Sequence, residues 1–332
     1  MHSLNFSDSE AALLHHTLTQ LYPRSGARVR SARPVPALHR GARVVTLEPS
    51  GVDERTPRRC LALFLPRAVP GLDPAIPYRH AQQHGLPAPV ILARAEDADQ
   101  VLLLCQPPTG RSIEETLREA RAPWEISSAA VSVARFLARL HRTVPGALGL
   151  ADTANDRAHA SELRLTALRV ASDALPNPVG HALRHALEWI DRNLDRDATE
   201  VPTLASPRLA ALFAADGEIE YVLGWERLAM GSPADTLADL LLDAQRFQPA
   251  VREQFISVTA ATYLQDGAAS VSDVPARVLL AYLEHVTIGW SARASLAAPS
   301  PQAAEAMVAA LENALRASQR GLVAVARHDF TP

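Results

Sequence analysis

The sequence predicts an α+β protein with a small, β-rich N-terminal part and a larger, mainly helical C-terminal part. Three observations predict this division. Short apolar runs, separated by Pro- and Gly-rich turns, occupy much of the first hundred residues. From about Ser127 onward, apolar residues recur at helical spacing in long segments. With 332 residues, the chain is also long enough for two parts that each have a core.

The N-terminal part is expected to begin with a helix. Ser7 followed by Glu10 is a capping-box pattern, and it predicts a helix that ends near Leu21. β-rich composition and turn residues then predict three strands, and a short helix follows a Pro-rich segment. These elements are expected over residues 28–32, 37–47, 59–65 and 78–84.

The C-terminal part is expected to be built from helices, because apolar residues recur there every three to four positions. The predicted helices cover residues 127–142, 158–171, 178–194, 233–246, 249–264, 274–295 and 301–325.

Composition argues against several classes of protein. A formal net charge of −3 and a pI near 6.5 give no basic footprint for nucleic acid. An aromatic content of 5% gives little surface for stacking bases. The chain has no apolar run of about 18 residues, so no membrane contact is expected. With no export signal and only Cys60 and Cys105, we expect reduced thiols and a cytoplasmic location.

Residues 204–238 carry the strongest motif, and they read LASPRLAALFAADGEIEYVLGWERLAMGSPADTLA. Asp216-Gly217 predicts a turn, a strand over 219–223 follows, and Trp225-Glu226 comes directly after it. This segment resembles the catalytic segment of the aminoglycoside phosphotransferase and choline kinase-like family, within the protein kinase-like superfamily. There, His-Gly-Asp is followed by Asn and by an apolar strand ending in Asp-Trp-Glu. The resemblance implies a bilobal protein kinase-like fold, with a small β-rich N-lobe and a larger, mainly helical C-lobe.

Three further segments resemble the same family in the same order. They are GLPAPV at 85–90, the apolar strand 101–106 with the turn at 110–113, and ARFLARLH at 134–141. We therefore expect three regions: an N-terminal helix over 1–24, an N-lobe with an antiparallel sheet over 25–106, and a helical C-lobe over 107–330. The C-lobe would contain the degenerate segment 204–238.

The chemical positions of the motif do not match the family. Ser206 stands in the slot of the first Asp, Ala211 in the slot of the Asn, and Gly224 in the slot of the second Asp. The resemblance implies that the first Asp accepts the proton of the attacking hydroxyl, while the Asn and second Asp hold Mg²⁺. Losing one such electrostatic group typically costs about 100- to 1,000-fold in rate. The sequence therefore predicts no catalytic residue and no metal site.

Supporting residues of the family are also absent. The chain has no lysine, and residues 60–65, which resemble the strand that carries a phosphate-binding basic residue, contain none. The predicted helix 78–84 has no acid, although relatives have a glutamate there. Thr236 occupies the slot of a structural acid, and Asp235 and Asp239 are the nearest candidates to replace it.

Five residues are candidates for a binding cleft. Arg208 stands in the slot of the second histidine of the catalytic loop and could bind an anion. The backbone at Gln106 could receive an adenine without hydrolysis. Glu226 or His141 could lie near Ser206 as a base. Trp225 and Glu226 are nevertheless expected to serve packing and loop hydrogen bonds more than chemistry.

Two function classes remain open. The first is a pseudokinase, a catalytically dead homologue that acts as a binding or scaffold protein for a partner protein or peptide. An active phosphotransferase relative is one candidate partner, and no cofactor is expected. The alternative is an enzyme with a repurposed cleft that catalyses a non-phosphoryl tailoring step in natural-product biosynthesis, for example on a peptide made by a biosynthetic cluster. A residual phosphotransferase is a third, less favoured interpretation.

Overall fold

A computed structural model describes residues 6–21, 28–34, 42–48, 59–66, 73–150, 154–196, 200–205, 207–266, 272–294 and 300–320. These residues form two compact units. The first combines residues up to 115 with 147–149 and 210–228. The second contains 116–146, 150–209 and the residues after 228. A sheet dominates the first unit and helices dominate the second, which confirms the α+β class. The region boundaries expected from the sequence remain a prediction.

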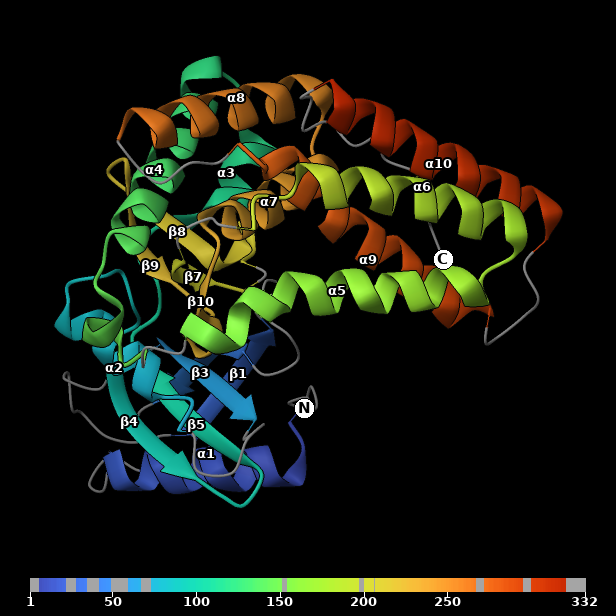
Figure 1. The fold of residues 1–332 in the computed structure, drawn as a ribbon. Helices are drawn as coiled ribbons and strands as arrows, with labels where there is room; N and C mark the ends of the chain where they lie inside the picture. The colour runs from blue at the N-terminus through green and yellow to red at the C-terminus, as the bar shows by residue number, and fades with distance from the viewer. Residues whose placement is uncertain are drawn as a thin grey trace. The chain divides into compact units, whose positions relative to one another are not determined.

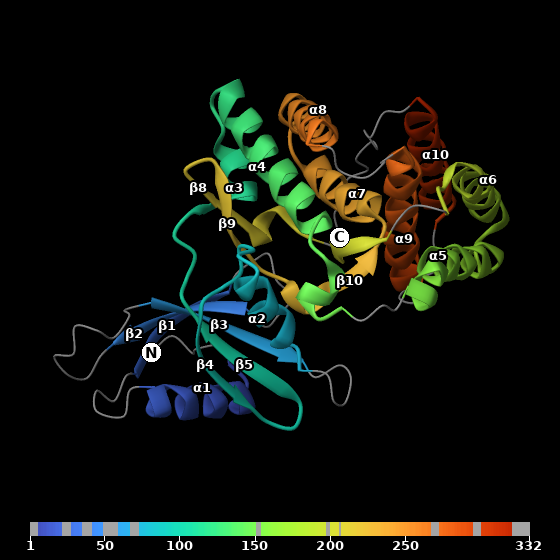
Figure 2. The ribbon, with the colours of Figure 1, turned by 60° about the vertical axis from the view of Figure 1, so that its left-hand side comes forward.

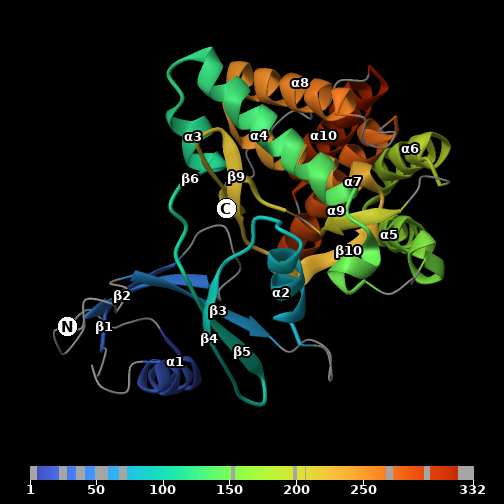
Figure 3. The same cartoon turned by 90° about the vertical axis from the view of Figure 1, so that its left-hand side faces the viewer.

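The first unit contains a five-stranded antiparallel sheet in the order β1-β2-β3-β5-β4 (Figure 3). The strands are β1 (Arg28–Pro34), β2 (Ala42–Glu48), β3 (Arg59–Pro66), β4 (Ile91–Glu96) and β5 (Gln100–Cys105). The predicted strands 28–32 and 59–65 are confirmed. The prediction over 37–47 is confirmed from residue 42 onward, and residues 37–41 lie outside the described part of the chain.

Helix α1 (Asp8–Leu21) begins with the predicted capping box. The Ser7 N–H donates to Glu10 Oε2 at 2.8 Å, and the Glu10 N–H donates to Ser7 Oγ at 3.2 Å. The buried side of α1 packs on one face of the sheet, to which β3 and β5 contribute alternate residues. This core consists of Leu13, Leu14, Leu18, Val45, Cys60, Ala62, Phe64, Leu102 and Leu104. Both cysteines of the chain are buried and free.

The first unit also contains a three-stranded sheet in the order β6-β8-β9. Its strands are β6 (Arg111–Ser112), β8 (Leu212–Ala215) and β9 (Glu218–Val222), and all pairings are antiparallel. The predicted turn is confirmed, because Asp216 and Gly217 both adopt positive φ, 50° and 82°. Two successive positive φ angles are typical of the tight turn that connects twisted strands. Two short helical elements, α2 (Ile76–Gln83) and η3 (Trp225–Arg227), also belong to the first unit. The residues of α3 (Ile113–Glu119), η1 (Pro145–Leu148) and η2 (Leu209–Ala211) are divided between the two units.

The second unit is a layered set of helices (Figures 1 and 2). These are α4 (Pro123–His141), α5 (Ala154–Ala174), α6 (Asn177–Asn193), α7 (Pro233–Asp243), α8 (Pro249–Gln265), α9 (Val274–Ala294) and α10 (Pro301–Gln319), with η4 (Ala244–Arg246) after α7. Helix α4 packs on α8, α7 on α9, and α6 on both α5 and α10. A small sheet pairs β7 (Val201–Leu204) with β10 (Leu228–Gly231).

Local sequence explains where several of these helices begin. Helices α4, α7, α8 and α10 start at a proline, whose fixed φ suits the first helical position and whose missing N–H costs no hydrogen bond there. The Oγ atoms of Ser232 and Ser300 accept backbone N–H groups in the first turns of α7 and α10. The predicted helices are confirmed, apart from residues 295 and 321–325, which lie outside the described part of the chain. None of the described helices has an apolar stretch of the length needed to cross a bilayer.

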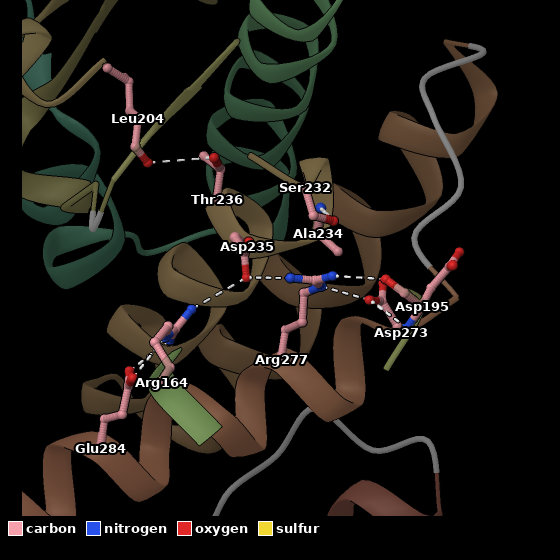
Figure 4. A network of polar contacts seen from close by, with 10 residues as sticks. All are labelled: Arg164, Asp195, Leu204, Ser232, Ala234, Asp235, Thr236, Asp273, Arg277 and Glu284. Carbon is pink, nitrogen blue, oxygen red and sulfur yellow. Dashed lines mark hydrogen bonds and ion pairs between the residues drawn. The ribbon is translucent and has the colours of Figure 1, made fainter. Parts of the chain in front are cut away.

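A buried polar network joins α5, α7 and α9 within the second unit (Figure 4). At its centre, the side chain of Arg277 is only 4% exposed and contacts Asp273 at 2.6 Å and Asp235 at 2.9 Å. Arg164 extends the network from Asp235, at 3.5 Å, to Glu284, at 2.6 Å. Asp273 also accepts the backbone N–H of Asp195, so that the chain after α6 is tied to the start of α9.

Candidate functional site

The β8–β9 hairpin brings two of the three expected slots together in the first unit. Leu212 pairs with Val222 near the open end of the hairpin, and the Leu223 N–H donates to the Ala211 carbonyl at 3.0 Å. Ala211 and Gly224 therefore lie next to each other in space, as their resemblance to two metal-binding positions requires. Their chemistry differs from that role, because Ala211 presents a buried methyl group and Gly224 has no side chain.

Gly224 has a backbone conformation that favours glycine. Its φ of 96° and ψ of 17° lie in the left-handed region, directly before η3. No heavy atom lies within 4 Å of the position that a Cβ would take. A side chain here would therefore meet conformational strain rather than a collision with its neighbours.

Tyr78 of α2 forms a hydrogen bond with Glu226, the residue that follows Trp225. Its hydroxyl donates to Glu226 Oε2 at 2.5 Å, and the phenol ring is fully buried. Burial, followed by the negative charge of Glu226, raises the pKa of Tyr78 well above its usual value. Tyr78 therefore remains a neutral donor. Trp225 is also fully buried, whereas the side chain of Glu226 is 20% exposed. Trp225 therefore packs in the interior of this unit, and Glu226 lies at the edge of that interior.

The strand end at Gln106 uses its backbone groups inside the first unit. The Gln106 N–H donates to the Val90 carbonyl at 2.9 Å, and the Gln106 carbonyl accepts the hydroxyl of Tyr221 at 2.6 Å. Pro107 and Pro108 follow, and neither has an N–H. Residues 106–108 thus offer a ligand no backbone donor that is not already bonded.

In the second unit, a buried acid fixes the loop that contains Arg208. Asp243 Oδ1 accepts from Arg208 at 3.2 Å, and Asp243 Oδ2 accepts the Leu209 N–H at 2.9 Å. Arg246 also donates to Oδ2, at 2.9 Å. The side chain of Asp243 is 3% exposed, whereas that of Arg208 is 54% exposed.

This arrangement corrects the expectation that Asp235 or Asp239 replaces the structural acid at the Thr236 slot. Asp235 instead pairs with Arg277 and Arg164, and the charge of Asp239 acts on Arg164. Thr236 itself makes a long hydrogen bond, 3.5 Å, to the Leu204 carbonyl. The acid that binds the loop backbone is Asp243, seven residues further along α7. This spacing of two helical turns returns a side chain to the same helix face.

His141 is the last residue of α4, and its ring faces Tyr263 of α8 rather than a nucleophile among the described residues. Its Nδ1 lies 2.6 Å from the hydroxyl of Tyr263, and the two rings meet edge to face with centroids 5.6 Å apart. Burial lowers the pKa of His141 to about 4, so that the ring is neutral at pH 7. Ser206, for which His141 was a candidate base, lies outside the described residues.

Comparison with known proteins identifies the family. A sequence profile of the phosphotransferase enzyme family, APH, matches residues 75–271, more than half of the chain. The chain belongs to this family. No curated protein sequence matches it significantly.

Solved structures of aminoglycoside phosphotransferases share the fold. The apo form of a thermostable mutant of APH(4)-Ia has a TM-score of 0.61 at 12% identity, over 91% of this chain and 98% of that one. The 3'-phosphotransferase of type VIII has a TM-score of 0.51 at 17% identity, over 83% and 100%. The GDP complex of wild-type 2'-phosphotransferase-IIIa has a TM-score of 0.55 at 10% identity, over 93% and 99%. At these identities the likeness establishes the protein kinase-like fold alone.

Within the phosphotransferase family frame, the structure places Gln106, Trp225, Glu226 and both described slot residues in the first unit, and Arg208 and His141 in the second. Three contributors were missed from the sequence: Tyr78, Tyr221 and Asp243. In the sequence, Tyr78 is marked only by its place in a predicted helix that has no acid. In the described residues, no three His, Cys, Asp or Glu side chains are arranged to hold a metal ion.

Proposed function

We propose that this protein is a catalytically inactive member of the phosphotransferase family that works by binding a protein or peptide partner. One observation carries the proposal. The β8–β9 hairpin keeps the backbone frame of the site, with Ala211 and Gly224 held side by side, but neither residue has a polar side-chain atom. The packing of this region is present without the groups that would perform phosphoryl transfer in the family.

The residues present do not fit the metal that the family implies. Mg²⁺ prefers six oxygen ligands, and proteins usually supply one or two carboxylates together with substrate phosphates. The methyl group of Ala211 and the missing side chain of Gly224 supply none. The slot of the proton-accepting Asp holds Ser206, whose hydroxyl is neutral at pH 7. The carboxylate of Glu226 is hydrogen-bonded to Tyr78.

The backbone at Gln106 further supports the loss of nucleotide binding. Solved relatives are described in complexes with ADP and hygromycin B, and with GDP. A purine base such as adenine has a hydrogen-bond donor next to an acceptor on one edge. To bind both, the protein must offer a backbone carbonyl and a free backbone N–H close together. Here the Gln106 N–H already donates to the Val90 carbonyl, and Pro107 and Pro108 have no N–H. The segment therefore offers an adenine no unbonded backbone N–H, which argues against the alternative that it receives the base.

The packing that remains supports a binding role. Helix α2 has no acid, and its Tyr78 joins the helix to η3 through a hydrogen bond to the charged acceptor Glu226. Such a bond contributes about 1.5–3 kcal/mol. The hydrogen bond between Tyr78 and Glu226 holds α2 against η3 without any catalytic group, so the fold of this unit is maintained although the phosphotransferase residues are absent. This is the behaviour expected of a scaffold.

The proposal is tested with the purified full-length chain. Isothermal titration with Mg·ATP and Mg·GTP should give no saturable heat, and single-turnover assays with γ-labelled nucleotide should transfer no phosphate. APH(4)-Ia with hygromycin B serves as the positive control. The triple variant Ser206→Asp, Ala211→Asn and Gly224→Asp shows whether the missing ligands alone account for the loss. Transfer by the unmodified chain would overturn the proposal.

Native mass spectrometry of the tagged protein from its own host tests the binding role. A stoichiometric protein or peptide, confirmed by reconstitution from purified components, supports the scaffold. A lone chain that converts a small molecule without nucleotide would instead establish the repurposed enzyme, the competing interpretation of the sequence.

A further inference from the structure

The loop that precedes the β8–β9 hairpin has an unusual charge. Between Leu204 and Ala215 the sequence reads LASPRLAALFAA, and Arg208 is its single charged residue. A loop that resembles a carboxylate-bearing, cation-binding segment therefore carries a cation and no acid. The charge available to a ligand at this loop has changed sign.

The guanidinium of Arg208 is oriented by the buried carboxylate of Asp243. The carboxylate of Asp243 is almost fully buried, and the Leu209 N–H at 2.9 Å and Arg246 at 2.9 Å fix its orientation. The contact from Arg208 to Oδ1, at 3.2 Å, then sets the direction of the guanidinium. Orientation by a buried group lowers the entropy that a side chain loses on binding a ligand.

The cluster keeps donors on its outer side. A guanidinium has five N–H groups, and the side chain of Arg208 is 54% exposed even though one Nη group contacts Asp243. Arg246 is 33% exposed, and its Cζ lies 5.5 Å from the centre of the Phe247 ring. Two guanidinium groups share one carboxylate, so the three side chains have a formal charge of +1. Planar guanidinium groups bind phosphate and carboxylate oxygens in a fork geometry.

We propose that Arg208, oriented by Asp243 and supported by Arg246, is the binding site for an anionic group, a phosphate or a carboxylate, of the ligand. The inference rests on the proposed function in so far as the loop belongs to the surface that binds the partner. It names the chemistry that the partner must present. A phosphorylated side chain and an acidic side chain or C-terminus share this chemistry.

The experiment titrates the full-length chain with inorganic phosphate and, separately, with glutarate, at constant ionic strength in buffer containing EDTA. Side-chain ¹⁵N–¹H resonances of arginine report binding, and Arg208→Gln assigns the Arg208 signal. We expect a saturable shift of this signal, with a Kd on the order of 1 mM for an isolated anion. Arg208→Gln should weaken binding at least about tenfold, and Arg208→Lys should retain the charge but bind more weakly than the wild type.

Arg196→Gln is the matched control, because Arg196 is also about half exposed and paired with acids, Glu162 and Asp191, but lies outside the cluster. It should bind anions like the wild type. Binding of phosphate alone would assign a phosphorylated ligand, and binding of glutarate alone a carboxylate. Unchanged affinity in Arg208→Gln, or no saturable shift in the wild type, would overturn the inference. These titrations contain no nucleotide or Mg²⁺, so phosphoryl transfer by the chain would refute the proposed function and leave this site standing.

Discussion

Replacing Arg277 by methionine should destabilise the second unit severely. Arg277 is 4% exposed and neutralises Asp273, whose side chain is 3% exposed. Methionine fills much of the same volume, so the lost packing is small and the main effect is electrostatic. After the substitution, Asp273 would keep only the backbone N–H of Asp195, at 3.2 Å, among its contacts within this network.

The size of the expected loss of stability depends on the charge of Asp273, which Arg277→Met leaves buried without its partner. Removing one partner of a buried ion pair costs about 3–5 kcal/mol, because the other charge remains desolvated. Asp235 adds little to this cost, since it is 28% exposed and keeps Arg164. We therefore expect a loss of about 3–4 kcal/mol. Adding Asp273→Asn removes the stranded charge while keeping an acceptor oxygen for the Asp195 N–H, and it should recover at least half of the loss.

Urea unfolding followed by circular dichroism measures the loss, and hydrogen–deuterium exchange of α5, α7 and α9 localises it to the second unit. Arg316→Gln is the matched control, because its contact to Glu312 is 3.9 Å long and both side chains are more than half exposed. That variant should change stability by less than about 0.5 kcal/mol. Equal effects of Arg277→Met and the control would refute the argument that Asp273 depends on Arg277.

Three further outcomes are expected. Tyr78→Phe removes the donor to Glu226, and because that carboxylate is 20% exposed and can rehydrate, the loss should be about 1–2 kcal/mol by urea unfolding. Gly180→Ala places a Cβ 2.4 Å from the Ser172 carbonyl oxygen where α5 meets α6, so it should cost about 1–3 kcal/mol by thermal unfolding despite better helix propensity. Burial lowers the pKa of His141 to about 4 from an ordinary 6.5, so its neutral form is favoured in the fold. Its contribution should be complete above pH 6.5 and should fall by up to about 3 kcal/mol toward pH 4, in urea titrations at a series of pH values.

Controls separate these effects from general damage. Gly289→Ala lies in helix α9 with no atom within 4 Å of the new Cβ, so it should stabilise the protein by about 0.5–1 kcal/mol. A loss there as large as that of Gly180→Ala would contradict the steric argument. Tyr78→Phe should cost less in a Glu226→Gln background than in the wild type. His141→Gln should flatten the stability curve between pH 6.5 and 4; an unchanged slope would point to other groups.

Local patterns predicted the elements well, because their causes are local. The Ser7 capping box, the Asp216-Gly217 turn and the apolar run of β3 each determine their own backbone within a few residues. The fold class and the family followed from the order and spacing of such segments.

The contacts that define the site could not be predicted in the same way. Tyr78 and Glu226 are 148 positions apart, and Gln106 and Tyr221 are 115 apart. Neither pairing leaves a periodic signal, because each depends on how distant segments fold together. Asp243 was missed for a related reason. Proximity in the sequence pointed to the acids nearest Thr236, although neither is in register, whereas the loop is bound by an acid two helical turns away.

The first unit is built from segments that are far apart in the sequence, and this affects how the protein folds during synthesis. The strand pairing of Arg111 with Ala214 and the bond from Tyr78 to Glu226 both need a segment that the ribosome makes long after the five-stranded sheet. A nascent chain that ends before residue 212 lacks the β8–β9 hairpin and also η3, so α2 has no partner for the Tyr78–Glu226 hydrogen bond. Incomplete sheets with exposed apolar surface are prone to aggregate during synthesis. Expression of residues 1–115 alone should therefore yield an aggregating fragment and not a folded lobe.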